Sequence, residues 1–162
     1  MPIGKTTAAL GQGFRATGHG YKVYMIQFMK GYPQYGEVTA VKGVPNFELK
    51  QFGTPDLIAT PGEIDFEEGK KGVKFAEKVI MGDEYDVVIL DEIGVAVEYG
   101  IVKLDEVLKL IDNKPEKVEL IITGGPKMHP KIKERADLLT EMRMIKHYYS
   151  SKGIKARLGI EY

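Results

Sequence analysis

The short stretch GKTT, from Gly4 to Thr7, carries residue types that bind phosphate. It has the form of the second half of a phosphate-binding loop, in which the lysine reaches phosphate oxygens and the next hydroxyl binds Mg²⁺. Lys5, Thr6 and Thr7 are expected to begin a helix, and the first N–H groups of a helix have no partner within it. Because this end of a helix favours anions, we predict that Gly4 to Thr7 bind the phosphates of a nucleotide.

A second candidate lies at the end of the apolar run VVILDE, where Asp91 and Glu92 follow four aliphatic residues. Buried strands that end in acids are typical of phosphate-loop NTPases, in which an acidic residue helps to hold Mg²⁺. Taken alone, the two acids could instead cap a helix or form a salt bridge. Their occurrence together with GKTT, with strands and helices between the two motifs, favours nucleotide binding.

Three further polar residues are secondary candidates for the nucleotide site. Gln27 lies at the end of the apolar run 22–28, Lys30 follows it, and Glu37 comes directly after a glycine. Each could equally be an ordinary solvent-exposed residue of a loop. They are candidates because loops at the ends of parallel strands gather around the ligand.

Apolar segments and amphipathic segments alternate along the chain. We expect strands at 22–28, 47–52, 86–92 and 117–124, helices at 5–18, 62–82, 103–113 and 129–137, and loops at 31–36, 53–62 and 123–130. Alternating strands and helices favour right-handed crossovers and a parallel sheet. The predicted fold is therefore α/β, with a mainly parallel central sheet covered by helices on both faces.

Length and composition limit the classes of function. The chain has 162 residues, which fits a single domain over 1–162, and its 23 basic residues balance its 23 acidic ones. This balance argues against a nucleic acid or an anionic membrane as partner. The sequence contains no cysteine, and its apolar runs are too short to cross a bilayer. We expect a cytoplasmic protein without disulfides or thiolate metal ligands.

Beyond GKTTAAL and VVILDE, several segments resemble one family. They are RATGHG (15–20), QFMKG (27–31), LIITG (120–124), ADLLTEM with IKH (136–147) and GIKARLGIEY (153–162). Together they resemble the ATP:corrinoid adenosyltransferases, and QFMKG and GIEY are more specific than GKT because generic NTPases do not carry them. The resemblance implies a RecA-like phosphate-loop fold, a homodimer and a flavoprotein as the source of electrons.

The resemblance also implies a reaction and roles for individual residues. A Co(I) corrinoid, cob(I)alamin or a cobinamide-type relative, would attack C5′ of the ATP ribose and expel triphosphate. Lys5 and Glu92 would be the catalytic residues, with Thr6 and Glu92 as magnesium ligands and Asp91 behind them or as a further ligand. Gly4, Lys5, Thr6 and Thr7 would bind ATP, together with Gln27, Lys30 and Glu37.

The start of the chain departs from the family pattern. The family loop reads G-x-G-K-G-K-T-T, whereas Met1, Pro2 and Ile3 precede Gly4 here. Proline removes a backbone donor from the loop, and isoleucine replaces a positive charge. We expect a genuine phosphate site whose loop is incomplete, in a fold that lacks the usual first strand.

Two other departures concern the substrates. Gly125 stands where the family frequently has an arginine, and Lys127 is a candidate replacement. Some relatives place an aromatic cluster after the strand at 47–52 to meet the corrinoid. This chain has GTPD there, with Phe52 and Phe66 as the candidate substitutes.

The three histidines do not suggest a metal triad or a catalytic base, because they are scattered along the chain. His19 is expected to cap a helix end, His129 to be a surface or capping residue, and His147 to pack or to orient a loop. Two alternatives to the adenosyltransferase remain open. They are another phosphate-loop kinase or ATPase, which would release ADP, and a non-catalytic relative, which an ATP-binding titration would identify.

Overall fold

The computed structural model describes residues 4–55 and 60–161 and contains one parallel sheet. Its strands are β1 (Val23–Phe28), β2 (Phe47–Phe52), β3 (Val87–Asp91) and β4 (Glu119–Ile122). They lie in the order β2-β1-β3-β4, and every neighbouring pair is parallel. The predicted α/β class is confirmed, and the arrangement is consistent with a RecA-like phosphate-loop fold.

The register of the sheet brings polar residues together at the carboxyl ends of the strands. Gln27 in β1 lies opposite Gln51 in β2 on one side and opposite Asp91 in β3 on the other. Thr123 directly follows β4, and its N–H donates to the carbonyl of Leu90 in β3. Four consecutive strands therefore deliver a polar side chain to one edge of the sheet.

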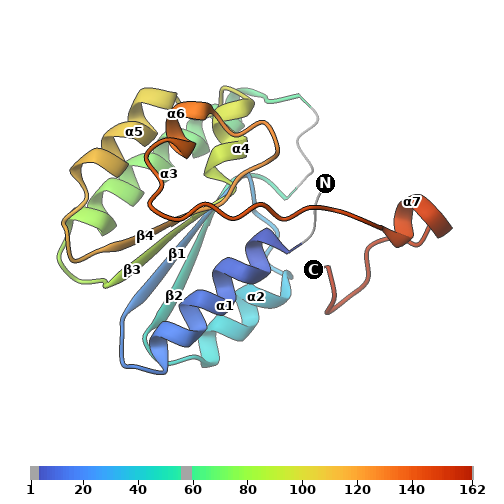
Figure 1. The fold of residues 1–162 in the computed structure, drawn as a ribbon, viewed down its shortest axis with the longest axis horizontal. Helices are drawn as coiled ribbons and strands as arrows, with labels where there is room; N and C mark the ends of the chain where they lie inside the picture. Colours follow the sequence, from blue (N-terminus) through green and yellow to red (C-terminus); the bar gives the residue numbers. More distant parts are fainter. Residues whose placement is uncertain (1–3, 56–59, 162) are drawn as a thin grey trace.

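Helix α1 (Lys5–Thr17) and helix α2 (Gly36–Ala40), which continues into the 3-10 turn Val41–Gly43, lie on one side of the sheet (Figure 1). Ala9 and Ala16 of α1 pack with Met25 and Ile89 of the strands. Gly13 allows α1 to approach closely, because a Cβ there would meet the Phe47 ring at 2.8 Å. This close packing fixes the first turn of α1 at the carboxyl edge of the sheet.

The opposite side of the sheet is covered by α3 (Glu63–Met81), α4 (Ile93–Glu98), α5 (Leu104–Asn113) and α6 (Pro130–Lys133) (Figure 1). The larger core lies here and includes Phe28, Phe52, Ile80 and Leu90. Both faces are covered, as the alternating sequence predicts. The helix predicted at 129–137 is shorter in the structure, where α6 ends at Lys133.

A long C-terminal segment departs from the compact body after α6. It crosses near the start of α1 and carries the isolated helix α7 (Tyr148–Lys152) (Figure 1). Its apolar side chains are uncovered, with Leu138 at 86%, Ile145 at 85% and Leu158 at 77% exposure. Within the described ranges, no helix is long and apolar enough to cross a membrane. The predictions for Met1, Pro2 and Ile3, for positions 56–59 of the loop at 53–62, and for Tyr162 lie outside the described residues.

Candidate nucleotide site

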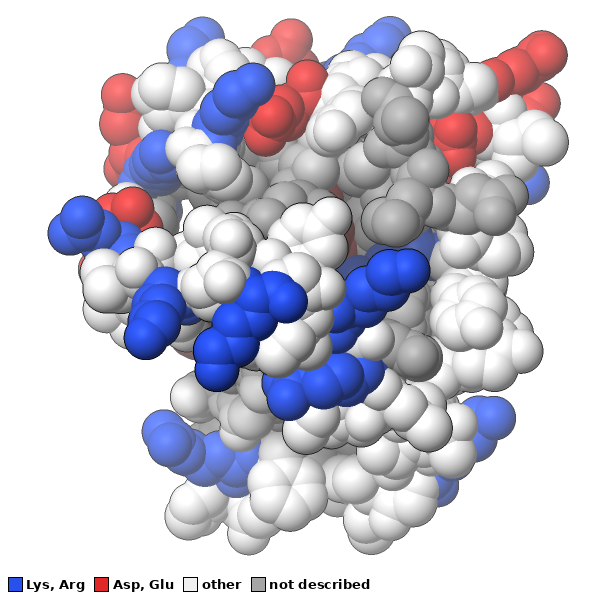
Figure 2. Space-filling model, turned by 90° about the vertical axis from the view of Figure 1, so that its right-hand side faces the viewer, with Lys and Arg blue, Asp and Glu red and all other residues white. Residues whose placement is uncertain are grey.

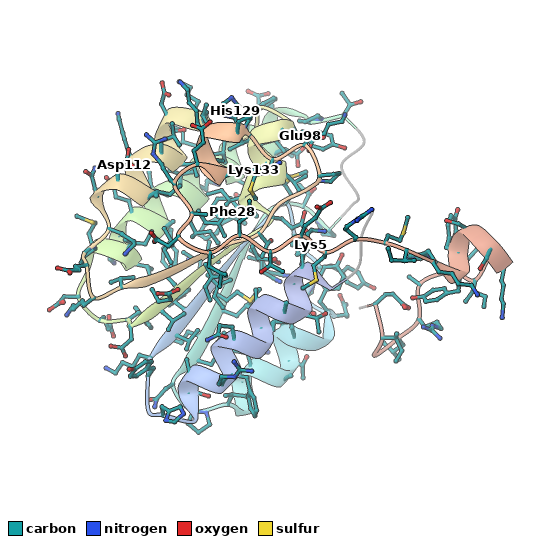
Figure 3. The ribbon with its side chains drawn as sticks, in the orientation of Figure 1. Lys5, Phe28, Glu98, Asp112, His129 and Lys133 are labelled. Carbon is teal, nitrogen blue, oxygen red and sulfur yellow. The ribbon has the colours of Figure 1, made fainter. Side chains whose placement is uncertain are left out.

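The first turn of α1 offers an anion site that Gly4 makes possible. Gly4 precedes the helix with φ 104°, a left-handed conformation that favours glycine, and as the N-cap residue it has no side chain to cap the first turn. The N-terminal amides of a helix point outward and carry partial positive charge. Lys5 lies at this end of α1 (Figure 3), so an ammonium accompanies those amides. The start of α1 thus offers amides and an ammonium to an anion, and the phosphate site predicted from GKTT stays a prediction.

Asp91 is the centre of the polar cluster beside this turn. Its carboxylate is fully buried at the end of β3. Oδ1 accepts from the hydroxyls of Thr6 at 3.0 Å and Thr123 at 2.8 Å. Oδ2 accepts from the Gln27 amide at 3.2 Å and from the Lys30 ammonium at 2.8 Å. The structure thus joins the two motifs that the sequence analysis paired, through a direct contact between Thr6 and Asp91.

The Thr6 hydroxyl and the Asp91 carboxylate are hydrogen-bonded here, and their spacing would also suit neighbouring ligands of a magnesium ion. Thr6 Oγ1 lies 3.0 and 3.2 Å from the two carboxylate oxygens. Neighbouring ligands of an octahedral Mg²⁺, at about 2.0–2.1 Å from the ion, are about 2.9 Å apart. No group of three or more His, Asp or Glu side chains suited to a metal occurs in the described part of the chain. These two residues fit an ion that takes its other ligands from phosphates and water.

The carboxylate of Glu92 pairs with a different lysine from the one that contacts Asp91. Glu92 has φ 63°, so the chain turns sharply between β3 and α4, and its carboxylate lies 3.9 Å from the Lys5 ammonium. Burial, and then the neighbouring Asp91, raise the pKa of Glu92 above its ordinary value. Its N–H donates to the Thr123 hydroxyl at 2.8 Å. The contact with Thr6 is made by Asp91, and the magnesium role of Glu92 stays a prediction.

Lys30 reaches the cluster from a constrained loop. Met29 has φ 56°, and the backbone at Gly31 lies so close to Gly53 that a Cβ on Gly31 would overlap the Gly53 carbonyl. Burial lowers the pKa of the Lys30 ammonium, but the carboxylates, led by Asp91, outweigh it and leave the pKa above its ordinary value. Lys30 is therefore a charged ammonium within the site.

Glu37 and Gln27 belong to the same network. Glu37 Oε1 lies 3.8 Å from the Lys30 ammonium and accepts from the Gln27 amide at 3.1 Å. Gln51 Nε2 donates to the side-chain oxygen Oε1 of Gln27 at 2.9 Å, which turns the Gln27 NH₂ toward the two carboxylates. Gln27, Lys30 and Glu37 are thus brought together as predicted, whereas Thr7 is exposed and takes no part in the cluster.

The sequence analysis missed two members of this network, Gln51 and Thr123. Each is a polar residue at or just after the carboxyl end of a predicted strand, in FELKQF and LIITG. That position was the signal that could have found them, because the ligand edge of a parallel sheet is formed by those ends.

Of the further candidates for substrate contacts, one is buried in the core and two are exposed. Phe52 is buried and packs against Phe75, so it faces the core and is not a free aromatic contact. Phe66 is exposed and lines an open cavity of about 460 Å³ at the start of α3. The Lys127 ammonium lies 3.8 Å from Glu98 at the end of α4 (Figure 3). Its role as a replacement for an arginine at Gly125 stays a prediction.

The histidines have structural roles at helix ends. The backbone N–H of His19 donates to the carbonyl of Ala16 at the end of α1. His129 and His147 precede α6 and α7, where their Nδ1 atoms accept from the N–H groups of Lys131 and Tyr149. The side-chain contacts agree with the capping predicted for His129 and show that His147 caps a short helix, whereas the role of the His19 side chain stays a prediction.

The C-terminal segment adds positive charge beside the phosphate end of α1. A Cβ on Gly4 would lie 3.9 Å from the Met142 sulfur, so this segment passes next to the first turn. Residues 143–157 contain five basic residues and no acidic one. Lys and Arg side chains cross the middle of the face seen in Figure 2. An anionic ligand at the start of α1 would therefore meet a basic surface.

Comparison with known proteins gives a consistent result. The family model for ATP:corrinoid adenosyltransferase BtuR/CobO/CobP matches residues 3–162. Corrinoid adenosyltransferases of Escherichia coli (strain K12) and Pseudomonas aeruginosa are 36% and 32% identical to this chain, over 98% of it and over 80% and 78% of their own lengths. A corrinoid adenosyltransferase of Salmonella typhimurium is 34% identical over 98% of this chain and 80% of its own length. The chain belongs to the ATP:corrinoid adenosyltransferase family.

Proposed function

We propose that the protein transfers the 5′-deoxyadenosyl group of ATP to the Co(I) centre of a corrinoid, as a step in the formation of adenosylcobalamin. The electron pair of Co(I) forms a bond to C5′, and the bond between C5′ and O5′ breaks. The electron pair of that bond leaves on the triphosphate. The observation that carries the proposal is the Thr6–Asp91 contact, which joins a phosphate-binding helix start to an acidic strand end in a chain of this family.

The residues of the site would act on the leaving group. Lys5 and the first-turn amides of α1 stabilise the negative charge that grows on the triphosphate, because fixed donors need no reorganisation during the reaction. Mg²⁺ would supply further charge stabilisation at Thr6 and Asp91, with Glu92 as the additional ligand that we propose. A side-chain base is not needed, because no proton is removed from the nucleophile.

Gln27, Lys30 and Glu37 would arrange this edge of the site. Their mutual contacts keep Asp91 surrounded by donors, and Lys30 provides a second ammonium near the phosphates. We assign ATP binding to Gly4, Lys5, Thr6 and Thr7. We further propose that the chain acts as a single-domain, cytoplasmic homodimer that receives its electrons from a flavoprotein, and these proposals rest on the family resemblance.

Product analysis tests the proposal. The protein is incubated with Mg-ATP and a chemically reduced corrinoid, and phosphorus NMR follows the nucleotide products. We expect triphosphate in equal amount to the adenosylated corrinoid. ADP with inorganic phosphate as the main products would instead identify a hydrolase or a kinase and contradict the assignment.

A further inference from the structure

The Lys30 ammonium contacts oxygens from both motifs, at the residues that we propose as magnesium ligands. Its ammonium lies 2.8 Å from Asp91 Oδ2 and 3.3 Å from Thr6 Oγ1. These are two of the oxygens whose spacing fits the edge of a magnesium octahedron. Thr6 Oγ1 and Asp91 Oδ2 are themselves 3.2 Å apart, so the three atoms form a triangle. An ammonium this close to both oxygens repels a divalent cation that would bind them.

The other hydrogen-bond partners of Asp91 are uncharged, so Lys30 supplies the positive charge that a metal ion would otherwise bring. Thr6 and Thr123 donate to Oδ1, and Gln27 donates to Oδ2. All three are uncharged, so Lys30 is the cation in direct contact with this buried carboxylate in the described structure. An unpaired buried carboxylate is costly, and the ammonium therefore stabilises the protein in the absence of metal.

The loop that carries Lys30 fixes where its ammonium can reach. Met29 has a left-handed backbone, and Gly31 touches the backbone of Gly53, which anchors both sides of Lys30. The lysine stem beyond Cα remains a chain of single bonds that can rotate. The ammonium can thus leave Asp91 without movement of the loop.

We propose that Lys30 is a built-in competitor for the divalent cation, which holds the metal position in the nucleotide-free protein and leaves it when the metal binds. The inference rests on the magnesium role within the proposed function. A triphosphate beside the first turn of α1 offers the displaced ammonium a new anionic partner. The metal therefore binds weakly alone and enters together with the nucleotide, which makes Lys30 the residue that sets this order.

Metal binding to the nucleotide-free protein is the first test. Titration of Mn²⁺, followed by the EPR signal of the free ion, compares the wild type with Lys30→Met. We expect at least tenfold tighter binding in the variant, equivalent to about 1.4 kcal/mol. Lys71→Met serves as the control for a lysine paired with a carboxylate on an exposed surface, and it should leave the affinity unchanged.

Loss of positive charge alone would also tighten metal binding, and Lys5→Met controls for this. Its ammonium is paired with Glu92 at 3.9 Å, whereas that of Lys30 contacts Asp91. If Lys30 competes with the metal, the affinity for Mn²⁺ should rise at least threefold more in Lys30→Met than in Lys5→Met. Equal gains, or no gain in Lys30→Met, would overturn the proposal.

A measurement on the wild type avoids dependence on a variant that folds poorly. The rate of Lys30 acetylation by acetic anhydride is measured by mass spectrometry with and without saturating Mn²⁺, with Lys71 as the internal reference. Displacement predicts a several-fold rise for Lys30 only, and an unchanged rate would refute it. These assays contain neither ATP nor corrinoid. A negative result in these assays would overturn the role of Lys30 and would leave the expected formation of triphosphate unaffected. Absence of triphosphate in the product analysis would contradict only the proposed function.

Discussion

Thr123 gives a demanding test of the polar cluster, because one hydroxyl serves a buried carboxylate and a half-buried N–H. It donates to Asp91 Oδ1 at 2.8 Å and accepts from the N–H of Glu92 at 2.8 Å. Thr123→Val keeps the shape of the side chain and removes both hydrogen bonds. The variant leaves the Glu92 N–H unpaired and deprives a buried carboxylate of a donor.

The cost follows from these two losses. An unsatisfied buried N–H costs about 1–3 kcal/mol, and a hydrogen bond to a charged group contributes about 1.5–3 kcal/mol. Since the two losses share one hydroxyl, we expect Thr123→Val to lower the free energy of unfolding by about 2–4 kcal/mol. For a chain of this size, each kcal/mol lowers Tm by roughly 2–4 °C.

Urea unfolding followed by circular dichroism measures this change. Thr123→Ser keeps the hydroxyl and should retain most of the stability. Thr17→Val is the matched control, because its hydroxyl donates to Phe14 at an exposed helix end, and it should cost less than about 1 kcal/mol. Wild-type stability in Thr123→Val, or an equal loss in Thr123→Ser, would refute the argument.

Three further predictions follow from the site. Lys5→Ala should reduce the rate of adenosyl transfer by about 100-fold or more, because a preorganised charge at the leaving group is lost, while unfolding in urea should change by under about 1 kcal/mol. Wild-type turnover in this variant would remove Lys5 from the site. Glu92 has a raised pKa in the folded protein, so its ionised form costs stability above that pKa, and the cost vanishes below the ordinary value of 4.5. Glu92→Gln should therefore be more stable than the wild type at pH 7 and equal to it near about pH 3.5, as measured by urea unfolding at both pH values, and the opposite trend would contradict the burial argument. Gly31→Ala would place a Cβ against the Gly53 carbonyl and should destabilise the protein by about 1–3 kcal/mol, whereas Gly11→Ala, which meets nothing within 4 Å on α1, should not destabilise it in the same assay.

The local patterns of the sequence predicted most of the secondary structure. The strand expected at 47–52 matches β2, and the helix expected at 62–82 corresponds to Glu63–Met81. Apolar runs and helical spacing are local features, so they can be recognised without knowledge of the packing. The short helices α2, α4 and α7 were not predicted, because five or six residues carry too little periodicity.

The site was predicted where motifs are local and missed where it depends on register. Lys5, Thr6 and Asp91 belong to recognisable stretches, and their approach follows from the topology of a parallel sheet. Gln51 belongs to the cluster because it lies opposite Gln27, and only the pairing of β2 with β1 specifies this register. Phe52 was a candidate contact for the corrinoid, but side chains alternate along a strand, so Phe52 points away from the side of Gln51 and faces the core.

The fate of C5′ tests the central claim most directly. The protein is incubated with ATP carrying ¹³C at the 5′ position, Mg²⁺ and a reduced corrinoid, and the carbon signal is followed by NMR in the dark. The account predicts that the label becomes bonded to cobalt in proportion to the triphosphate released. A label that remains in ADP or in unreacted nucleotide, while phosphate is released, would contradict it.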